Sequence, residues 1–225
     1  MLSLVDKYNI NRFIFSSSAT VYGIPTEIPL NEISQIGINI TNPYGKTKYM
    51  LEEIIKDFSI NSTCKFIILR YFNPVGAHES GLIGEDPNDI PNNLMPYIIK
   101  VATKEYKTLN IFGNDYNTPD GTCIRDFIHV VDLAKAHVIA NTFILDNNLE
   151  IFNIGTGKGI SVLELVNTFS KINNIYISYV FSDRRNGDIE KNYADVTKAN
   201  NVLGWKAEKI IEDICKDAYN FANNK

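Results

Sequence analysis

Residues 12–18 read Arg-Phe-Ile-Phe-Ser-Ser-Ser, an apolar run that ends in three serines. A short apolar run of this kind is typical of a buried strand in a parallel sheet. A second one, Lys-Phe-Ile-Ile-Leu-Arg-Tyr, occupies residues 65–71, and the stretch between the two is long enough to hold a crossover helix. A strand, a crossover helix and a second strand form a βαβ unit. The sequence therefore predicts an α/β fold with a doubly wound parallel sheet.

The crossover helix is predicted to run from Pro43 to about Asn61. Asn42 suits the N-cap and Pro43 the first helical position. Tyr44 and Lys48 then lie one turn apart on the same helix face. A phenol has a pKa of ~10, and an adjacent ammonium and the positive end of a helix would both lower it, making Tyr44 a usable base. The spacing alone also fits an ordinary exposed Tyr and Lys, so the rest of the chain has to decide.

Polar residues follow the predicted strands. Ser16, Ser17 and Ser18 end the first strand, and a turn that begins at Asn73 ends the second. Open α/β sheets bind ligands at this edge, although a Ser-rich turn without function is the simpler alternative. A third strand, 151–154, precedes a glycine-rich turn. Its glycines are not spaced as in the dinucleotide-binding fingerprint, and the required acidic residue does not follow, so a tight turn is the better interpretation.

The other elements are predicted from apolar periodicity and capping residues. Residues 1–9 should end an amphipathic helix with Leu2, Val5 and Tyr8 buried, Asp132 should cap one helix, and Ser161 should cap another. The expected helices are 94–104, 133–145, 162–172, 195–203 and 208–223, and the expected extended segments are 109–113, 124–130 and 175–182.

Composition excludes several classes of protein. The net charge is −4 and no basic cluster is present, which argues against nucleic-acid binding. The apolar runs are too short to span a membrane, and the N-terminus lacks the layout of a signal peptide. The 3 cysteines and 3 histidines lack the spacing of metal ligands. We therefore expect no metal site, no disulfide framework, no membrane association and a reducing, cytoplasmic location.

Longer motifs, in order along nearly the whole chain, carry a resemblance to the UDP-glucose (UDP-galactose) 4-epimerases of the extended short-chain dehydrogenase/reductase group. These motifs are Phe-Ile-Phe-Ser-Ser-Ser-Ala-Thr-Val-Tyr-Gly (13–23), Pro-Tyr-Gly-Lys-Thr-Lys (43–48), Leu-Arg-Tyr-Phe-Asn-Pro-Val-Gly-Ala-His (69–78), Gly-Glu-Asp-Pro (84–87), Ile-Pro-Asn-Asn-Leu-Met-Pro-Tyr-Ile (90–98), Ile-Phe-Gly-Asn-Asp-Tyr (111–116), Asp-Gly-Thr-Cys-Ile-Arg-Asp-Phe-Ile-His-Val (120–130), Asn-Ile-Gly-Thr-Gly (153–157) and Arg-Arg-Asn-Gly-Asp (184–188).

The resemblance implies an incomplete Rossmann-like sheet and a small mixed α/β substrate-binding domain. The remaining half of the NAD-binding domain would be residues 1–74 and about 121–156, and the UDP-sugar-binding region about 75–120 and 157–225. The strand, glycine-rich turn and helix that hold the NAD pyrophosphate in such proteins are not found in this sequence. We therefore expect a truncated or split product with an exposed apolar sheet edge, which is inactive without a separate N-terminal fragment.

The resemblance also implies an activity. The chain would interconvert UDP-glucose and UDP-galactose, an isomerase reaction in which C4 of the sugar is oxidised to a ketone and reduced again with NAD. Tyr44 would take the proton of the C4 hydroxyl, Lys48 would hold the nicotinamide ribose and lower the pKa of Tyr44, and Ser18 would hydrogen-bond the same hydroxyl. Ser16 and Phe72 would complete the cofactor contacts.

The substrate contacts are likewise implied by the resemblance. Asn73, Asn93 and Leu94 would meet the substrate together with Ser18. Ile111, Phe112 and Gly113 would face the uridine. Arg125 and Arg185 would neutralise the diphosphate and Asp188 would bind a ribose. Asn192 occupies a position where the family often carries a bulky Tyr. The smaller Asn side chain would admit N-acetylated sugars.

Other functions and assemblies remain open. The chain would alternatively be a non-catalytic nucleotide-sugar-binding remnant, or a partner subunit without a pyrophosphate site. A 4,6-dehydratase is disfavoured because Ala19 and Thr20, in place of an Asp-Glu pair, follow Ser18. By resemblance we expect a homodimer formed through the helix that bears Tyr44, with Tyr49, Ile54 and Phe58 available on its outer face.

Overall fold

The computed structural model describes residues 1–224, which form two compact units. The first unit consists of Met1–Phe72, Leu133–Gly157 and Asn192–Lys206, and the second of Asn73–Asp132, Lys158–Lys191 and the described residues from Ala207 onward.

The limits of these units differ from the predicted domain limits in two places. Residues 121–132 belong to the second unit, because their strands pair with strands of that unit. Residues 192–206 belong to the first unit, where the N–H of Leu30 donates to the carbonyl of Tyr193 and Leu30 bridges Ala194. Both differences come from pairing between residues far apart in the sequence, which local patterns do not reveal.

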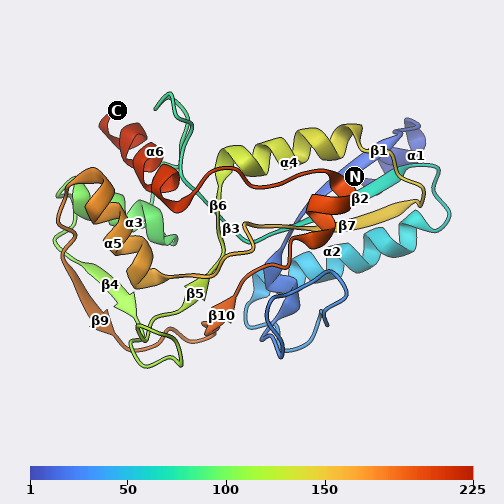
Figure 1. Cartoon of the computed structure of the whole chain (residues 1–225). Coiled ribbons are helices and arrows are strands. Elements are labelled where there is room, and N and C mark those ends of the chain that lie inside the picture. Colours follow the sequence, from blue (N-terminus) through green and yellow to red (C-terminus); the bar gives the residue numbers. More distant parts are fainter. Residues whose placement is uncertain (225) are drawn as a thin grey trace. The chain divides into compact units, whose positions relative to one another are not determined.

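The first unit is built on a parallel sheet in the order β1-β2-β7. Its strands are β1 (Arg12–Ser18), β2 (Lys65–Tyr71) and β7 (Leu149–Ile154), as Figure 1 shows. Ile67, Ile68 and Leu69 in the central strand β2 are fully buried, as expected for a strand covered on both faces. The predicted parallel α/β sheet is therefore confirmed.

Helices cover the two faces of this sheet. α2 (Pro43–Ser59) lies on one face and α4 (Val130–Thr142) on the other (Figure 1). Successive side chains of a strand point to opposite faces. Accordingly, Ser17 contacts Glu52 of α2 and Ser16 contacts His137 of α4. The remaining helical segments of the first unit are α1 (Leu2–Lys7), η1 (Ala19–Tyr22) and η2 (Ala199–Leu203).

The second unit combines short strand pairs with three helices. β3 (Asn73–Val75) runs parallel to β6 (Phe127–His129), β4 (Leu109–Phe112) runs parallel to β9 (Tyr179–Ser182), and β5 (Ile124–Arg125) lies between β8 (Ile160–Ser161) and β10 (Lys191–Asn192). The helices are α3 (Leu94–Ala102), α5 (Val162–Asn173) and α6 (Ile211–Asn223).

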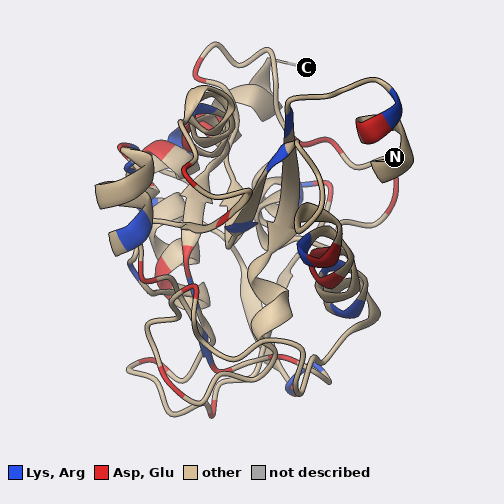
Figure 2. Ribbon diagram, turned by 90° about the vertical axis from the view of Figure 1, so that its right-hand side faces the viewer, with Lys and Arg blue, Asp and Glu red and all other residues tan. Residues whose placement is uncertain are grey.

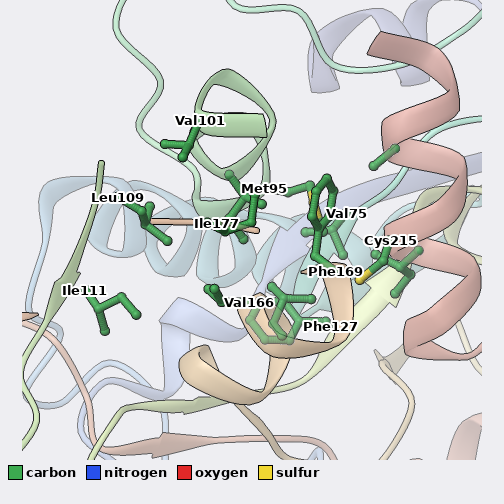
Figure 3. Packing of buried hydrophobic residues seen from close by; sticks show 14 residues of the cluster. Val75, Met95, Val101, Leu109, Ile111, Phe127, Val166, Phe169, Ile177 and Cys215 are labelled. Carbon is green, nitrogen blue, oxygen red and sulfur yellow. The ribbon is translucent and has the colours of Figure 1, made fainter. Parts of the chain in front are cut away.

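A single buried cluster holds these elements of the second unit together. Figure 3 shows its apolar side chains, among them Leu109 of β4, Phe169 of α5 and Cys215 of α6. Phe169 and Ile98 of α3 are fully buried. The cluster contains residues of α3, α5, α6 and β4. It therefore fixes the positions of the strands whose ends carry the polar residues described below.

The local signals at two helix starts are confirmed. The side chain of Asn42 accepts a hydrogen bond from the N–H of Gly45 at 2.7 Å. Ser161 and Glu164 form a reciprocal capping box at the start of α5.

Two local predictions are wrong. Asp132 is not a cap, because α4 already begins at Val130 and the Asp132 carboxylate accepts the N–H groups of Glu208 and Lys209. Tyr8 is 63% exposed, because α1 ends at Lys7 and only Val5 of the predicted stripe is buried.

Charged residues of both signs are interspersed along the ribbon (Figure 2). No helix within residues 1–224 is long and apolar enough to cross a membrane.

Candidate functional site

Tyr44 lies in the first turn of α2, and the side chain of Ser18 at the end of β1 is close enough to its hydroxyl to lower the pKa of Tyr44. Ser18 is buried, and its Oγ accepts from the N–H and the hydroxyl of Thr20 at 3.2 and 3.0 Å. Tyr44 as a residue is 52% exposed. A half-exposed tyrosine thus lies beside a buried, oriented hydroxyl.

Lys48 points back to the strand from the next turn of α2. Its Nζ donates to the backbone oxygen of Ser16 at 2.7 Å and lies 5.1 Å from the ring centroid of Phe15. Partial burial lowers the pKa of Lys48. Its Nζ also lies 5.5 Å from the ring centroid of Tyr44. The ammonium therefore sits beside the Tyr44 ring and is bound by the strand.

The predicted lowering of the Tyr44 pKa is wrong for this arrangement. Burial of the hydroxyl raises the pKa of Tyr44 first, the neighbouring Tyr71 raises it further, and the adjacent Ser18 side chain only partly offsets both. Lys48 makes no comparable contribution because its charge is directed at Ser16. Tyr44 of this chain is consequently a neutral phenol near pH 7.

The other predicted cofactor residues lie in the same unit. Ser16 Oγ is 3.1 Å from Nε2 of His137, whose Nδ1 is 2.9 Å from the carbonyl of Leu133. Since only a protonated Nδ1 bonds a carbonyl, Nε2 accepts from Ser16. Phe72 is buried in an apolar cluster with Tyr22 and its neighbours. Ser16, Ser18, Tyr44 and Lys48 are thus brought together at the carboxyl end of β1, and Phe72 packs into the core.

The second unit contains a cavity of about 390 Å³. Most of the predicted substrate residues line it, namely Asn73, Asn93, Leu94, Ile111, Phe112, Arg125, Arg185 and Asp188. Tyr97, Cys123, Phe127 and Val162 also line it and were not predicted. The fixed apolar walls come from α3, β4, β6 and α5.

Two arginine side chains line this cavity, and they are held in different ways. Arg125 Nη1 donates to the carbonyl oxygens of Ile189 and Ile124 at 2.5 and 2.9 Å, and its Nη2 lies 3.7 Å from Asp188 Oδ1. Arg185 instead lies over the ring of Phe112, 5.0 Å from the centroid. Arg125 is therefore held rigidly by its hydrogen bonds, whereas the guanidinium of Arg185 is oriented by the ring of Phe112. Together they suit a bulky dianion.

Three predicted substrate residues, Ser18, Gly113 and Asn192, do not line the cavity. Gly113 has a φ of +79°, and a Cβ there would meet the Tyr116 ring at 2.3 Å. It lines a separate hollow with Asp115 and Arg184, so a turn requirement explains this glycine. Asn192 belongs to the first unit, where its side chain is buried and its Oδ1 has no hydrogen-bond partner within residues 1–224.

Sequence reasoning missed a buried polar network in the first unit, centred on Glu52 and Arg70. One signal was available, because Glu52 follows Lys48 by four residues and shares its helix face. No group of three or more His, Cys, Asp or Glu side chains within residues 1–224 is arranged to hold a metal ion.

Comparison with known proteins places these sites in context. The family model described as "NAD dependent epimerase/dehydratase family" matches residues 1–155. UDP-glucose 4-epimerase of Bacillus subtilis is 49% identical over 222 residues, which cover 98% of this chain and 65% of that protein. The chain thus spans about two thirds of the length of this curated relative, 65%.

Solved structures agree with this match. The UDP-glucose 4-epimerase of Bifidobacterium longum, in complex with NAD+ and UDP, superposes with a TM-score of 0.94 at 48% identity and covers 99% of this chain and 67% of that chain. The UDP-Glc/GlcNAc 4-epimerase of Campylobacter jejuni gives a TM-score of 0.81 at 35% identity, covering 100% of this chain and 68% of that one.

Proposed function

Because the chain belongs to the NAD dependent epimerase/dehydratase family, we propose that it acts as a UDP-glucose 4-epimerase, which interconverts UDP-glucose and UDP-galactose. The observation that carries the proposal is that Tyr44, Lys48 and Ser18 lie together at the carboxyl end of β1. The 49% sequence identity between this chain and the Bacillus subtilis UDP-glucose 4-epimerase supports the proposal.

The nucleotide is assigned to the cavity of the second unit. Its apolar walls at Leu94, Ile111 and Phe112 suit a flat base. The guanidinium groups of Arg125 and Arg185 suit a diphosphate, and the carboxylate of Asp188 suits the hydroxyls of a ribose. Asn73 and Asn93 would serve the sugar. The UDP named for the Bifidobacterium longum structure supports this assignment.

Proton transfer is assigned to Tyr44 and Ser18. In the oxidation step the C4 hydroxyl of the sugar would give its proton to the phenolate form of Tyr44, and in the reduction step the resulting phenol would return that proton to the ketone oxygen. Ser18 would donate to the same oxygen and orient it. The raised pKa of Tyr44 favours the neutral phenol, which is the form that the reduction step uses.

The residues at the end of β1 fit one end of NAD. Lys48 offers an ammonium and Tyr44 offers a hydroxyl, donors that match the hydroxyls of the nicotinamide ribose, whereas the Ser16 hydroxyl donates to His137 and Ser16 stays a predicted cofactor contact. When bound, NAD+ would accept the C4 hydride and return it, and its positive ring would favour the phenolate. Within residues 1–224 the glycine-rich turn at 155–159 leads into β8 and not into a helix, so we assign no pyrophosphate site to it. Phe72 stays a predicted neighbour of the nicotinamide.

The partners are proposed from the same comparison. Since the chain spans 65% of its Bacillus subtilis relative, we propose that turnover uses an N-terminal segment that supplies the pyrophosphate site. We also propose a homodimer through α2. Of the predicted face only Ile54 is exposed, because Tyr49 and Phe58 pack into apolar clusters, and Met50 and Leu51 extend the exposed apolar surface.

Two smaller proposals follow from side chains already described. Asn192 is smaller than the bulky Tyr that the family often carries at this position, and this size difference would leave room for an N-acetyl group and allow turnover of N-acetylated UDP-sugars. The solved UDP-Glc/GlcNAc 4-epimerase is a precedent. Cys64, Cys123 and Cys215 are free and buried, which supports a reducing, cytoplasmic environment.

The decisive experiment measures binding and turnover separately. UDP binding to the purified chain is followed by calorimetry, and conversion of UDP-galactose is followed with NAD+, with and without a supplied N-terminal segment. We expect UDP binding by the chain and turnover that is lost in Tyr44→Phe. UDP binding without turnover under either condition would favour the alternative of a nucleotide-sugar-binding module.

A further inference from the structure

Three polar side chains lie side by side across the sheet of the first unit. Ser17, Arg70 and Asn153 are register partners in β1, β2 and β7, and all three are buried. Partners in register point to the same face of a sheet. Ser17 and Arg70 both contact Glu52, so the row faces α2.

Glu52 of α2 is fully buried above this row. Its Oε1 accepts from Ser17 Oγ at 2.5 Å, and its Oε2 accepts from Arg70 Nη2 at 2.6 Å. Arg70 Nε adds contacts at 3.0 and 3.2 Å to the two carboxylate oxygens. Burial alone would lower the pKa of Arg70, but the bond and charge of Glu52 raise it. The guanidinium of Arg70 is therefore held against the Glu52 side chain in a fork geometry.

The network continues to the third strand. Arg70 Nη1 donates to Tyr22 Oη at 3.1 Å, and Tyr22 Oη donates to Asn153 Oδ1 at 2.6 Å. The N–H of Asn153 donates to Glu32 Oε1 at 2.7 Å and its Nδ2 donates to the carbonyl of Leu30 at 2.9 Å. One connected set of hydrogen bonds thus joins all three strands, η1 and α2.

Glu52 shares a helix face with Tyr44 and Lys48, because the three follow one another at intervals of four residues. Each contacts a different serine of β1. Tyr44 lies beside Ser18, Lys48 donates to the backbone oxygen of Ser16, and Glu52 accepts from Ser17. Of these contacts, only that of Glu52 is fully buried and has several hydrogen bonds. The Glu52 contact fixes the position of α2 along β1 and the rotation of α2 about its own axis.

Buried ion pairs add little net stability, because desolvation offsets the attraction between the charges, yet they define one arrangement out of several. We propose that Glu52, held by Arg70 and Ser17, is a positioning residue that sets α2 so that the Tyr44 hydroxyl meets Ser18. The role in turnover rests on the proposed epimerase function, whereas the placement of Tyr44 does not.

The test replaces the pair by apolar residues of similar size. In Glu52→Leu/Arg70→Met no buried charge is left uncompensated, so the variant is expected to fold. The matched control is Glu53→Gln/Lys56→Gln, which removes the exposed ion pair of 2.7 Å on the same helix. The readout is the titration of Tyr44 by NMR in chain labelled at the tyrosine ring carbons. Tyr44→Phe identifies the signal, and circular dichroism verifies folding.

We expect the titration midpoint of Tyr44 to move in the pair variant and to stay in the control. Both its partial burial and its proximity to Ser18 depend on where α2 lies. A folded pair variant with the wild-type midpoint would overturn the proposal. Ser17→Ala removes a single bond from Glu52 and is expected to move the midpoint less. If the pair variant does not fold, Ser17→Ala decides alone, and an unchanged midpoint counts against the proposal.

Turnover gives the second readout, because a misplaced base lowers kcat and leaves substrate binding intact. We expect kcat of the pair variant to fall about 100-fold with KM for UDP-galactose unchanged, since Arg125 and Arg185 are untouched. Wild-type chain without turnover in the presence of the supplied N-terminal segment would count against the epimerase assignment only, and the Tyr44 titration would still test the placement. Equal losses in the pair variant and the control would contradict a specific role for Glu52.

Discussion

Lys48 Nζ donates to the backbone oxygen of Ser16 at 2.7 Å. This bond joins the first turns of α2 to the end of β1, and the ammonium donates to the strand while it lies 5.5 Å from the ring centroid of Tyr44. The pKa of Tyr44 is raised by burial and not lowered by its basic neighbour. The Lys48 ammonium and the Tyr44 hydroxyl would both contact a bound ribose. The hydrogen bond to Ser16 therefore holds Lys48 in position for that contact.

Tyr44→Phe should abolish proton transfer without affecting the fold. The ring stays and only the hydroxyl is lost, so turnover should fall by about 100-fold or more. The midpoint of urea unfolding should change little, because Tyr44 is 52% exposed. Tyr8→Phe, also at an exposed tyrosine, is the control. Comparable turnover in the two variants would exclude Tyr44 as the base.

Arg185→Met should weaken UDP binding, because the cavity loses one of its two cations. Loss of a charged hydrogen bond of about 1.5–3 kcal/mol corresponds to a Kd roughly 10 to 100 times higher. Arg184→Met is a matched control one residue away. Arg184 binds Asp115 at 2.7 Å and lies over the ring of Tyr116 outside this cavity. Calorimetry with UDP measures both, and equal effects would argue against the assigned cavity.

Gly45→Ala should move the start of α2. A Cβ at this position would lie 2.8 Å from Ile40 Cγ2 and 3.0 Å from the backbone oxygen of Thr20. Overpacking of this kind costs about 1–3 kcal/mol, which exceeds the gain in helix propensity of about 1 kcal/mol. Lower stability in urea together with lower turnover is expected. Lys46→Ala, at an exposed position of the same turn, should leave both unchanged.

Protonation of His129 should destabilise the second unit. Its Nδ1 accepts the N–H of Val131 and its Nε2 lies 3.2 Å from Asp217, with Lys209 and Asp132 nearby. Burial lowers the pKa of His129 below its unfolded value of ~6.5, although Asp217 opposes this. A lowered pKa means that the stabilisation is complete above about pH 6.5 and is lost as pH falls toward the folded pKa.

The melting temperature should therefore fall between about pH 7 and pH 5 in the wild type. The fall should be smaller in His129→Asn, which cannot gain a proton. His78→Asn, at an exposed histidine, should behave like the wild type. A pH dependence that is the same in all three proteins would rule out His129 as the titrating group.

Several features followed directly from the sequence. The parallel pairing of 12–18, 65–71 and 149–154 was foreseeable because short apolar runs with a crossover helix have few alternatives. The caps at Asn42 and Ser161 depend on contacts within three residues. Most of the predicted substrate residues line the second-unit cavity, and they were foreseeable only from motif resemblance, since their side chains come from several distant elements.

By itself, the sequence determined the order of strands and helices, the start of α2 and the identity of the polar residues at the strand ends. These depend on backbone propensity, capping and burial patterns along short stretches. Only the tertiary structure decided that Lys48 is bound to Ser16, that Glu52 and Arg70 lie between α2 and the sheet, and that residues 192–206 join the first unit. Each of these depends on desolvation and on partners distant in the chain, which no local pattern contains.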